Sequence, residues 1–215
     1  MMQAIVVAGI GTDVGKTVVS AALVRGLGAS YWKPVQAGTE PMTDSQRVAA
    51  WAGCAPGRIL PEAYCLQAPE SPHSSAEKEG IRLDTGRLKL PADLAGPLVI
   101  EGAGGLMVPL NEESVYLDVI VQWQQPVVLV ASLYLGAINH SLLSVEVLKI
   151  RNVPVLGILF TGPASASMES YILQYSGYRP LGRVPQLDEI NPDSLQWAYQ
   201  HHIDHAYLAS ALGRS

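Results

Sequence analysis

The stretch Ala4-Ile5-Val6-Val7-Ala8-Gly9-Ile10-Gly11-Thr12-Asp13-Val14-Gly15-Lys16-Thr17 decides the fold class of this chain. An apolar run leads into a glycine-rich loop, and an apolar helical pattern over Thr17–Gly28 follows directly. A phosphate-binding loop requires this order, because backbone N–H groups and the helix N-terminus then surround the phosphate oxygens. Measured from Gly9, the loop is one residue longer than the common pattern G-x-x-x-x-G-K-[ST]. We expect Lys16 to reach the β- and γ-phosphates of a nucleotide and the Thr17 hydroxyl to ligate Mg²⁺.

The rest of the chain continues the alternation of strand and helix. Continuous apolar runs rich in Val and Ile, which are typical of strands buried on both faces of a parallel sheet, occur at Leu98–Ile100, Val127–Ala131 and Val155–Phe160. A helical pattern covers His140–Ile150, and Asn139 is a candidate cap for its start. We therefore predict one α/β domain over residues 1–215, with a P-loop fold and a mostly parallel sheet flanked by helices.

Two segments carry weaker patterns. Ala68–Leu90 contains two prolines and many polar residues, so it is expected to form a long loop, and long loops in compact domains are often functional. The C-terminal segment Pro192–Ser215 is expected to form one helix or two, with Leu195, Tyr199 and Leu208 facing the body of the protein.

The composition excludes several classes of protein. Of the 215 residues, 48% are hydrophobic and only 15% are charged, a balance that excludes a disordered chain. The net charge is −5 without a basic run, which argues against a nucleic-acid partner. No apolar stretch approaches the roughly 20 residues that cross a bilayer, and Met1–Gly9 has no basic segment typical of a secretory signal. We expect a cytoplasmic protein without membrane contacts, in which Cys54 and Cys65 are reduced, partly buried thiols.

Two further stretches place charged side chains where strands end. Ligands of open α/β sheets bind at the carboxyl ends of strands. Glu101, in Leu98–Gly105, is therefore expected to face the P-loop crevice. Its carboxylate is a suitable ligand for Mg²⁺, which prefers oxygen ligands. The alternative is that Glu101 caps a helix or pairs with a lysine. In Tyr31–Gly38, Lys33 is a candidate second cation beside a transferred phosphoryl group, although a single lysine at a strand end is usually a solvated surface residue.

Six motifs, in their order and spacing, resemble the dethiobiotin synthetase family of the biotin pathway. They are G-x-x-T-D-V-G-K-T at 9–17, K-P-V-Q-x-G at 33–38, S-P-H at 71–73, E-G-A-G-G-L at 101–106, L-G-A-I-N-H-x-L-L at 135–143 and G-x-V-P at 182–185. The resemblance extends from the P-loop to about Pro185. It implies a single-domain P-loop α/β fold that acts as a homodimer.

The resemblance also implies a reaction. Members of this family condense CO₂ with 7,8-diaminopelargonate (7,8-diaminononanoate), using ATP and Mg²⁺. One amine captures CO₂ as a carbamate, a carbamate oxygen takes the γ-phosphoryl group, and the second amine closes the ureido ring and expels phosphate. Such a mechanism needs positioning and charge neutralisation more than covalent work by the protein.

Matching the motifs to the family implies a role for each residue. The catalytic residues are Lys33, Lys16 and Thr12, and the Mg²⁺ ligands are Thr17, Asp44 and Glu101. The nucleotide-binding set comprises Asp13, Val14, Gly15, Lys16, Thr17, Asp44, Glu101, Gly102, Ala103, Gly104, Thr161, Gly162, Pro185, Gln186 and Leu187. The substrate set comprises Lys33, Ala37, Ser71, Pro72, His73 and, at the subunit interface, Gly136, Ala137, Ile138 and Asn139. Considered without the family, Asp44 is a cap or a first-turn carboxylate of a helix.

Three positions depart from the family pattern. Ala37 stands where the family usually has a Ser or Thr hydroxyl near the substrate, a hydrogen bond of about 0.5–1.5 kcal/mol that Thr39 or water would have to supply. Thr161 stands where an Asn usually reads the adenine edge, and one hydroxyl cannot present the paired donor and acceptor of an amide. The preference for ATP over other triphosphates is therefore open. Tyr134 stands where many members have a small residue.

Two other functions are compatible with a P-loop. A related P-loop amidoligase acting on another carboxylate would normally use a glutamine-hydrolysing partner domain with a reactive cysteine, and neither Cys54 nor Cys65 lies in a nucleophile-elbow setting. A partitioning-type P-loop ATPase would carry an additional lysine early in the loop, where this chain has Gly9, Ile10 and Gly11. Dependence of ATP turnover on the diamine and bicarbonate separates these three functions.

Overall fold

The computed structural model describes residues 4–92 and 96–213. Its elements in chain order are β1 Ala4–Gly9, α1 Lys16–Leu27, β2 Ser30–Trp32, β3 Val35–Ala37, α2 Asp44–Ala52, β4 Tyr64–Leu66, α3 Pro72–Lys78, the 3₁₀ turn η1 Thr85–Arg87, β5 Leu98–Gly105, α4 Tyr116–Trp123, β6 Val127–Ser132, α5 Ala137–Ile150, β7 Val155–Thr161, α6 Ala166–Ser176, β8 Pro180–Val184, α7 Pro192–His202 and α8 His205–Ala211.

Among the described residues, the main sheet has six strands in the order β2-β5-β1-β6-β7-β8, and every neighbouring pair is parallel. A second, two-stranded parallel sheet pairs β3 with β4. Strand β1 lies in the middle of the main sheet, where Val7 pairs with Glu101 of β5 on one side and with Val128 of β6 on the other. The predicted α/β class and parallel sheet are confirmed, and the P-loop follows the central strand.

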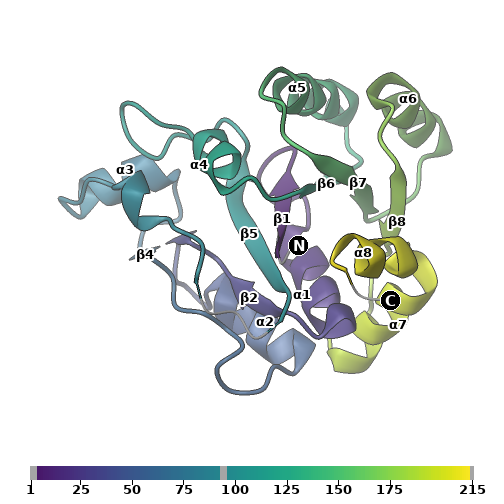
Figure 1. Ribbon diagram of the computed structural model, residues 1–215, viewed down its shortest axis with the longest axis horizontal. Helices are drawn as coiled ribbons and strands as arrows, with labels where there is room; N and C mark the ends of the chain where they lie inside the picture. Colours follow the sequence, from purple (N-terminus) through teal and green to yellow (C-terminus); the bar gives the residue numbers. More distant parts are fainter. Residues whose placement is uncertain (1–3, 93–95, 214–215) are drawn as a thin grey trace.

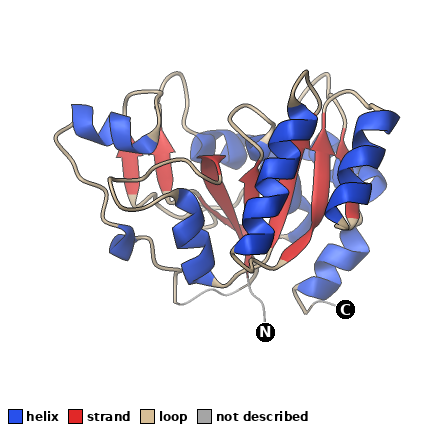
Figure 2. Ribbon diagram, turned by 90° about the horizontal axis from the view of Figure 1, so that it is seen from above, coloured by secondary structure: helices blue, strands red, loops and turns tan. Residues whose placement is uncertain are grey.

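Helices cover both faces of the main sheet (Figure 1). Helices α4, α5 and α6 lie along one face, whereas α1, α2 and α7 lie along the other. Seen from above, the sheet forms a middle layer between these helices, and α3 lies with the small β3–β4 sheet beyond the β2 edge (Figure 2). This arrangement exposes one end of the sheet, where the carboxyl ends of β1 and β5 meet.

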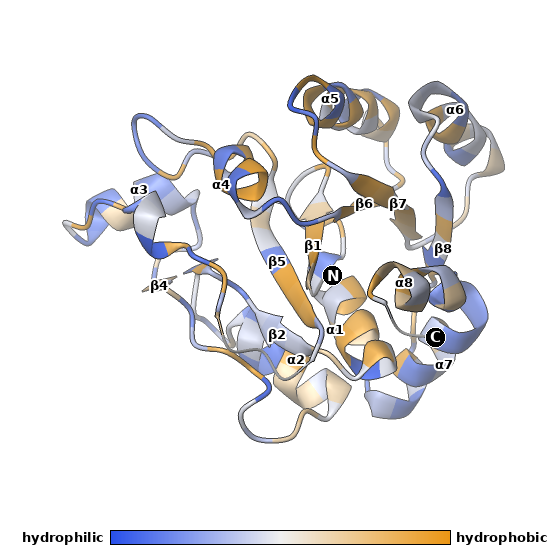
Figure 3. Cartoon of the chain, in the orientation of Figure 1, coloured by the Kyte–Doolittle hydropathy of each residue, from blue (hydrophilic) through white to orange (hydrophobic). Residues whose placement is uncertain are grey.

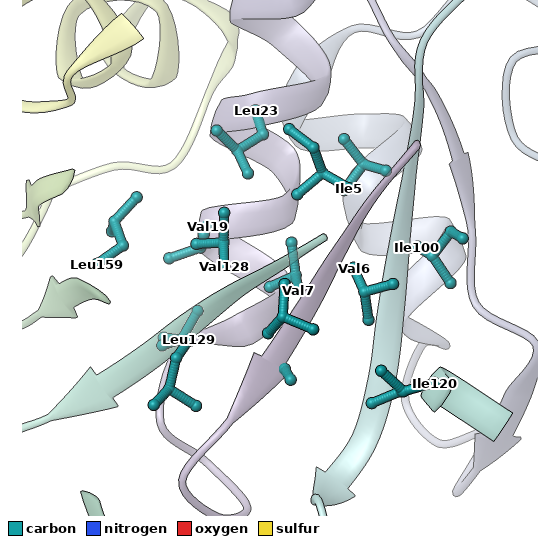
Figure 4. Packing of buried hydrophobic residues seen from close by; sticks show 14 of the residues in the cluster. Ile5, Val6, Val7, Val19, Leu23, Ile100, Ile120, Val128, Leu129 and Leu159 are labelled. Atoms are coloured by element: carbon teal, nitrogen blue, oxygen red, sulfur yellow. The ribbon is translucent and has the colours of Figure 1, made fainter. Parts of the chain in front are cut away.

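The core forms because the central strands are apolar on both faces. Figure 4 shows Ile5 and Val6 of β1 with Val19 and Leu23 of α1 on one side of the strand and Ile120 of α4 on the other. All five side chains are buried. Each Å² of apolar surface that is buried stabilises the fold by about 25 cal/mol. A strand that is buried on both faces is therefore the main stabilising feature of an α/β sheet.

Hydropathy follows the same layers. The central strands and much of α1 are hydrophobic, while most of α7 is hydrophilic (Figure 3). Leu195, Tyr199 and Leu208 of the C-terminal helices are buried, as predicted, and the segment forms two helices, α7 and α8, within its described residues. Residues 214 and 215 of the predicted segment lie outside the described part. None of the described helices is long and apolar enough to cross a membrane.

Three local predictions were wrong. The segment Ala68–Leu90 contains helix α3, with Pro72 at its first position, and the turn η1, because proline is compatible with the first turn of a helix. Asn139 does not cap α5: the helix begins two residues earlier, after Gly136. Cys65 is exposed, because the side chains of a strand alternate and its neighbours in β4 point inward; Cys54 is half-buried, as predicted.

Candidate active site

The loop between β1 and α1 has the geometry of a phosphate-binding loop. Gly15 precedes α1 with φ of 87°, a left-handed conformation that favours glycine. Within the described part of the chain no side chain caps the start of α1, and its first turn carries no acidic residue. Lys16 Nζ donates a hydrogen bond of 2.7 Å to the carbonyl oxygen of Gly11 and so lies across the loop. Free N–H groups at a helix N-terminus, with a lysine above them, suit phosphate oxygens.

A cavity of about 680 Å³ opens beside this loop, a volume typical of ligand sites. It brings together predicted residues from five separate segments of the chain: Thr12, Asp13, Gly15, Lys16, Thr17, Lys33, Ala37, Asp44, Ser71, Pro72, Glu101, Ala103 and Gly104. The P-loop, the end of β2, the start of α2, the start of α3 and the outer half of β5 therefore face one volume. Thr39, a candidate to replace the hydroxyl missing at Ala37, is not among the lining residues.

A buried cluster of charges forms the floor of this cavity. Lys33 Nζ is paired with the carboxylate of Asp44 and, at 3.1 Å, with Glu101 Oε1. Thr17 Oγ1 donates to the same Glu101 oxygen at 2.9 Å. Glu101 is fully buried and Lys33 is only 5% exposed, so Lys33 is not the solvated surface residue that a single lysine usually is. Glu101 lies inside β5, not at its end, because the strand continues to Gly105.

Burial and charge tune the two lysines in opposite directions. Burial lowers the pKa of Lys16 to about 8, against the opposing effect of Glu101. Burial also acts to lower the pKa of Lys33, but the charges of Glu101 and Asp44 outweigh it and the pKa is raised. Lys33 is therefore a permanent cation at neutral pH, whereas Lys16 titrates close to it.

Three side chains position Asp44 at the start of α2. Thr43 caps the helix, and its hydroxyl accepts from the N–H of Gln46 while the Gln46 side chain accepts from the N–H of Thr43. The N–H of Asp44 donates to Gln36 Oε1 at 3.1 Å, and Gln36 Nε2 donates to the Gly38 carbonyl at 2.7 Å. Asp44 is thus a first-turn carboxylate, and Gln36 ties it to the strand that also carries Ala37.

The donor set on this wall fits Mg²⁺. Within residues 4–92 and 96–213, no three His, Cys, Asp or Glu side chains gather closely enough to hold a metal ion by themselves. Mg²⁺ does not need such a cage, because it is usually held by one or two carboxylates together with water and the phosphates of the substrate. Thr17, Asp44 and Glu101 provide one hydroxyl and two carboxylates beside the loop that would hold those phosphates.

The predicted base-side residues lie outside the cavity lining, and one of them, Thr161, contacts the P-loop. The Thr161 hydroxyl donates to the Val14 carbonyl at 2.8 Å, and the side chain packs on Gly15. Arg183 Nη1 donates to the carbonyl of Gly162 at 2.7 Å, which fixes the loop after β7. The single donor of Thr161 is therefore used inside the protein. Gly102 and the segment 185–187 also lie outside the lining.

The predicted substrate residues divide between three places. Ser71 and Pro72 begin α3 and line the cavity, whereas His73 is exposed and lines a separate hollow of about 470 Å³. The Ser71 hydroxyl and His73 Nδ1 are 3.0 Å apart, so the histidine belongs to the helix start and not to a loop. The segment Gly136–Asn139 forms the first turn of α5 and lies outside both cavities of this chain.

Several lining residues were not predicted from the sequence: Val18, Gln36, Gly38, Glu40, Met42, Arg47, Trp51, Pro69, Glu70 and Val108. Tyr31, which donates to Glu101 Oε2 at 2.9 Å behind the cavity wall, was also missed. A usable signal existed for Tyr31. Tyr31 precedes Lys33 by two positions, and side chains two apart in an extended segment point the same way.

Comparison with known proteins identifies the family of the chain. A family model described as an AAA domain matches residues 3–194. The chain is 51% identical over 199 residues to the ATP-dependent dethiobiotin synthetase BioD of Afipia carboxidovorans, an alignment that covers 93% of this chain and 95% of that protein. It is 52% identical to the same synthetase of Rhodopseudomonas palustris and 47% identical to that of Brucella anthropi, with similar coverage.

Solved structures of low sequence identity share the fold. The septum site-determining protein MinD of Pyrococcus horikoshii, complexed with Mg-ADP, superposes with a TM-score of 0.57 at 13% identity, covering 92% of this chain and 86% of that one. A ParA family ATPase of Chlorobium tepidum gives 0.55 at 9% identity, covering 93% and 98%. These likenesses establish a P-loop α/β architecture alone. With about half of its residues identical to those of the synthetases over 93% of its length, the chain belongs to the ATP-dependent dethiobiotin synthetase family.

Proposed function

We propose that this chain uses ATP to close the ureido ring of dethiobiotin from 7,8-diaminononanoate and CO₂. The observation that carries the proposal is one cavity in which a P-loop lysine and a buried lysine–carboxylate cluster face each other. Phosphoryl transfer to a weak oxygen nucleophile needs these groups, because its barrier is lowered by positioning and by charge neutralisation.

The nucleotide phosphates bind along the loop 13–17. The N–H groups at the start of α1 and the Lys16 ammonium surround them, and Thr161, Gly162 and the segment 185–187 form the side of the site nearest the base. Thr17, Asp44 and Glu101 would hold Mg²⁺, which would supply positive charge to neutralise the phosphates. Gly102, Ala103 and Gly104 bring the backbone of β5 close to the same phosphates.

The proposed reaction has three steps. One amine of the diamine adds to CO₂ and loses a proton, which gives a carbamate. A carbamate oxygen attacks the γ-phosphorus, and ADP leaves from it. The second amine then attacks the carbonyl carbon of the carbamic–phosphoric anhydride, loses a proton and expels phosphate as the ring closes. Lys33 and Thr12 contact the carbamate and the transferring group, where negative charge moves during the reaction.

The diamine lies between Lys33 and the start of α3. Ala37, Ser71 and Pro72 line this side of the cavity, and His73 stands at its outer edge. The far end of the substrate is a carboxylate. In the cavity of one chain, the half-buried Arg47 and the start of the short helix α3, which has no side-chain cap, are candidates to bind it. A second copy of the chain would add the start of the longer helix α5.

We therefore propose a homodimer in which the start of α5 from one chain completes the site of the other. Gly136 precedes α5 without a side-chain cap in the described structure, so the N–H groups of Ile138 and Asn139 are available for a carboxylate, whereas the N–H of Ala137 donates to the Tyr134 carbonyl at 2.9 Å. Large apolar side chains are exposed on and beside α5 and α6, among them Leu135, Leu143, Ile150, Tyr171 and Tyr175. A patch of this kind marks an interaction surface.

Product analysis separates the proposal from its rivals. Incubation with the diamine, ATP, Mg²⁺ and ¹³C-bicarbonate is expected to give dethiobiotin with the label in its ureido carbonyl. A partitioning-type ATPase would release phosphate without the diamine, and an amidoligase would need ammonia or glutamine and a different acid. Absence of labelled dethiobiotin from reactions with folded, ADP-binding protein would contradict the proposal.

A further inference from the structure

Tyr31 holds the Glu101 carboxylate from the side opposite the cavity. The tyrosine lies in the middle of β2, paired with Val99 of β5, and its side chain is completely buried. Its hydroxyl donates to Glu101 Oε2 at 2.9 Å. The two side chains are 70 residues apart in the sequence, so the contact exists only because β2 and β5 are neighbours in the sheet.

The two oxygens of Glu101 have separate partners. Oε1 accepts from Thr17 Oγ1 at 2.9 Å and from Lys33 Nζ at 3.1 Å, and all three residues line the cavity. Oε2 accepts from Tyr31, which does not line it. Rotation of the carboxylate away from this orientation would break bonds on both sides. The arrangement therefore fixes the plane of the carboxylate and keeps one of its oxygens directed at the cavity.

Packing alone does not require a hydroxyl at this position. Phenylalanine would fill nearly the same volume, and a buried hydroxyl without a partner costs about 1–3 kcal/mol. Burial and the charge of Glu101 raise the pKa of Tyr31 well above its ordinary value, so the phenol remains a neutral donor. A neutral donor behind a carboxylate is the arrangement that orients metal ligands in proteins.

We propose that Tyr31 is a positioning residue that fixes Glu101 for Mg²⁺ and thereby sets the metal requirement of phosphoryl transfer. The proposal rests on the proposed function, because Glu101 is assigned to Mg²⁺ there. Tyr31 itself touches neither metal nor substrate. It acts by keeping Glu101 Oε1 directed at the place where Thr17 and the phosphates meet.

The structure offers a matched control for the test. Tyr116 is also fully buried, and its hydroxyl also contacts Glu101, but at 3.4 Å and on the main-chain oxygen. Tyr31→Phe and Tyr116→Phe therefore remove the same atom from the same kind of environment beside the same residue. Only the first change frees the carboxylate.

The experiment measures three quantities for both variants: the Mg²⁺ concentration that half-activates dethiobiotin synthesis, the affinity for ADP with and without Mg²⁺ by calorimetry, and Tm. Tyr31→Phe is expected to raise the Mg²⁺ requirement about tenfold and to reduce the gain in ADP affinity that Mg²⁺ gives. Its affinity for ADP in EDTA should stay unchanged. Tyr116→Phe should lower Tm at most. In a Glu101→Gln background, Tyr31→Phe should add nothing to the Mg²⁺ requirement.

Equal Mg²⁺ titrations for Tyr31→Phe, Tyr116→Phe and the wild type would overturn the proposal, as would a lower Tm for Tyr31→Phe without any change in metal dependence. If Tyr31→Phe does not fold, Tyr31→Leu removes the hydroxyl by another route and is judged by the same criteria. Failure of the proposed function is a different result: the wild-type chain would then bind Mg²⁺ and ADP but form no dethiobiotin.

Discussion

Lys33 lies in an environment that few lysines occupy, because it is buried between two carboxylates while its ammonium still faces a cavity. Lys33→Ala is expected to lower kcat by several orders of magnitude and to weaken nucleotide binding much less, because the lost cation acts mainly on charge that develops during transfer. Steady-state kinetics and the Kd for ADP check this. Lys89→Ala, which removes an exposed lysine that does not line the cavity, is the control. An unchanged kcat with a large loss of ADP affinity would contradict the assigned role.

The lowered pKa of Lys16 leads us to expect that nucleotide affinity depends on pH. Its pKa of about 8 in the free protein must rise when phosphates bind, since their charge favours the ammonium form. Below pH 8 the lysine is already charged, so affinity is flat there; above pH 8 binding takes up a proton and affinity falls, by about tenfold per pH unit at most. The phosphate itself does not contribute in this range, because its last pKa is about 6.

Calorimetry of ADP binding between pH 7.5 and 9.5 is the measurement, in buffers of different ionisation enthalpy so that proton uptake is counted (the range brackets the Lys16 pKa of about 8). Lys16→Arg keeps its charge throughout this range and should abolish the dependence. Affinity that stays constant or rises with pH in the wild-type chain would show that Lys16 does not contact the phosphates.

How much of the site could be predicted from sequence depends on the distance between partners along the chain. Lys16 and Thr17 follow from a local motif, and Glu101 from its position on an apolar strand. The ion pair of Lys33 with Glu101 spans 68 residues, and the contact of Tyr31 with Glu101 spans 70. Such pairs depend on which strands are neighbours in the sheet, and no local sequence pattern predicts the order of the strands.

Helices α1 and α7 pack so closely that one of them needs a glycine. A Cβ built at Gly26 would lie 2.1 Å from the ring of Tyr199. Gly26→Ala is therefore expected to destabilise the protein by about 1–3 kcal/mol, although alanine favours a helix by up to about 1 kcal/mol over glycine. Thermal and denaturant unfolding measure the change, and ADP affinity should not change.

A second background isolates the cause. With Tyr199→Ala already present, Gly26→Ala should be neutral or stabilising, because only the helix propensity remains. If Gly26→Ala destabilises the Tyr199→Ala protein as much as the wild type, the close approach of α1 and α7 is not the reason for the glycine.

At the level of elements, sequence patterns identify long and apolar segments. Strands β1, β5, β6 and β7 were predicted from continuous runs of Val, Ile and Leu. Strands β3 and β4 have three residues each, too few for a period, and β8 contains Pro180 and Gly182, which are unfavourable in strands. The start of α5 was misplaced because a side-chain cap at Asn139 was expected. The helix instead begins after Gly136, which adopts φ of 99° and provides no side-chain cap.

At the scale of the whole molecule, we expect active sites that are each built from residues of two chains. The dimer should have twice the chain mass of 23.0 kDa in solution. A Lys16→Ala chain and an Asn139→Asp chain should each be inactive. The first lacks the ammonium group proposed to bind the phosphates, and the second places a negative charge in the first turn of α5, where we propose that the substrate carboxylate binds. Mixed, they should recover about a quarter of wild-type activity, because each heterodimer has one intact site.

Native mass spectrometry of differently tagged chains verifies that heterodimers form. Mixtures that contain heterodimers but regain no activity would show that each chain builds its site alone. A fully active species with the mass of one chain would exclude the dimer from catalysis.

The most direct test of the central claim is the yield of phosphate and dethiobiotin from ATP when the diamine and bicarbonate are omitted in turn. The proposed chemistry predicts equal amounts of phosphate and dethiobiotin with both substrates present, and almost no phosphate when either is absent, because the γ-phosphoryl group has no acceptor without the carbamate. Phosphate release that continues without the diamine, or that exceeds the dethiobiotin formed, would contradict the claim that the Lys16–Lys33 cavity is built for this ring closure.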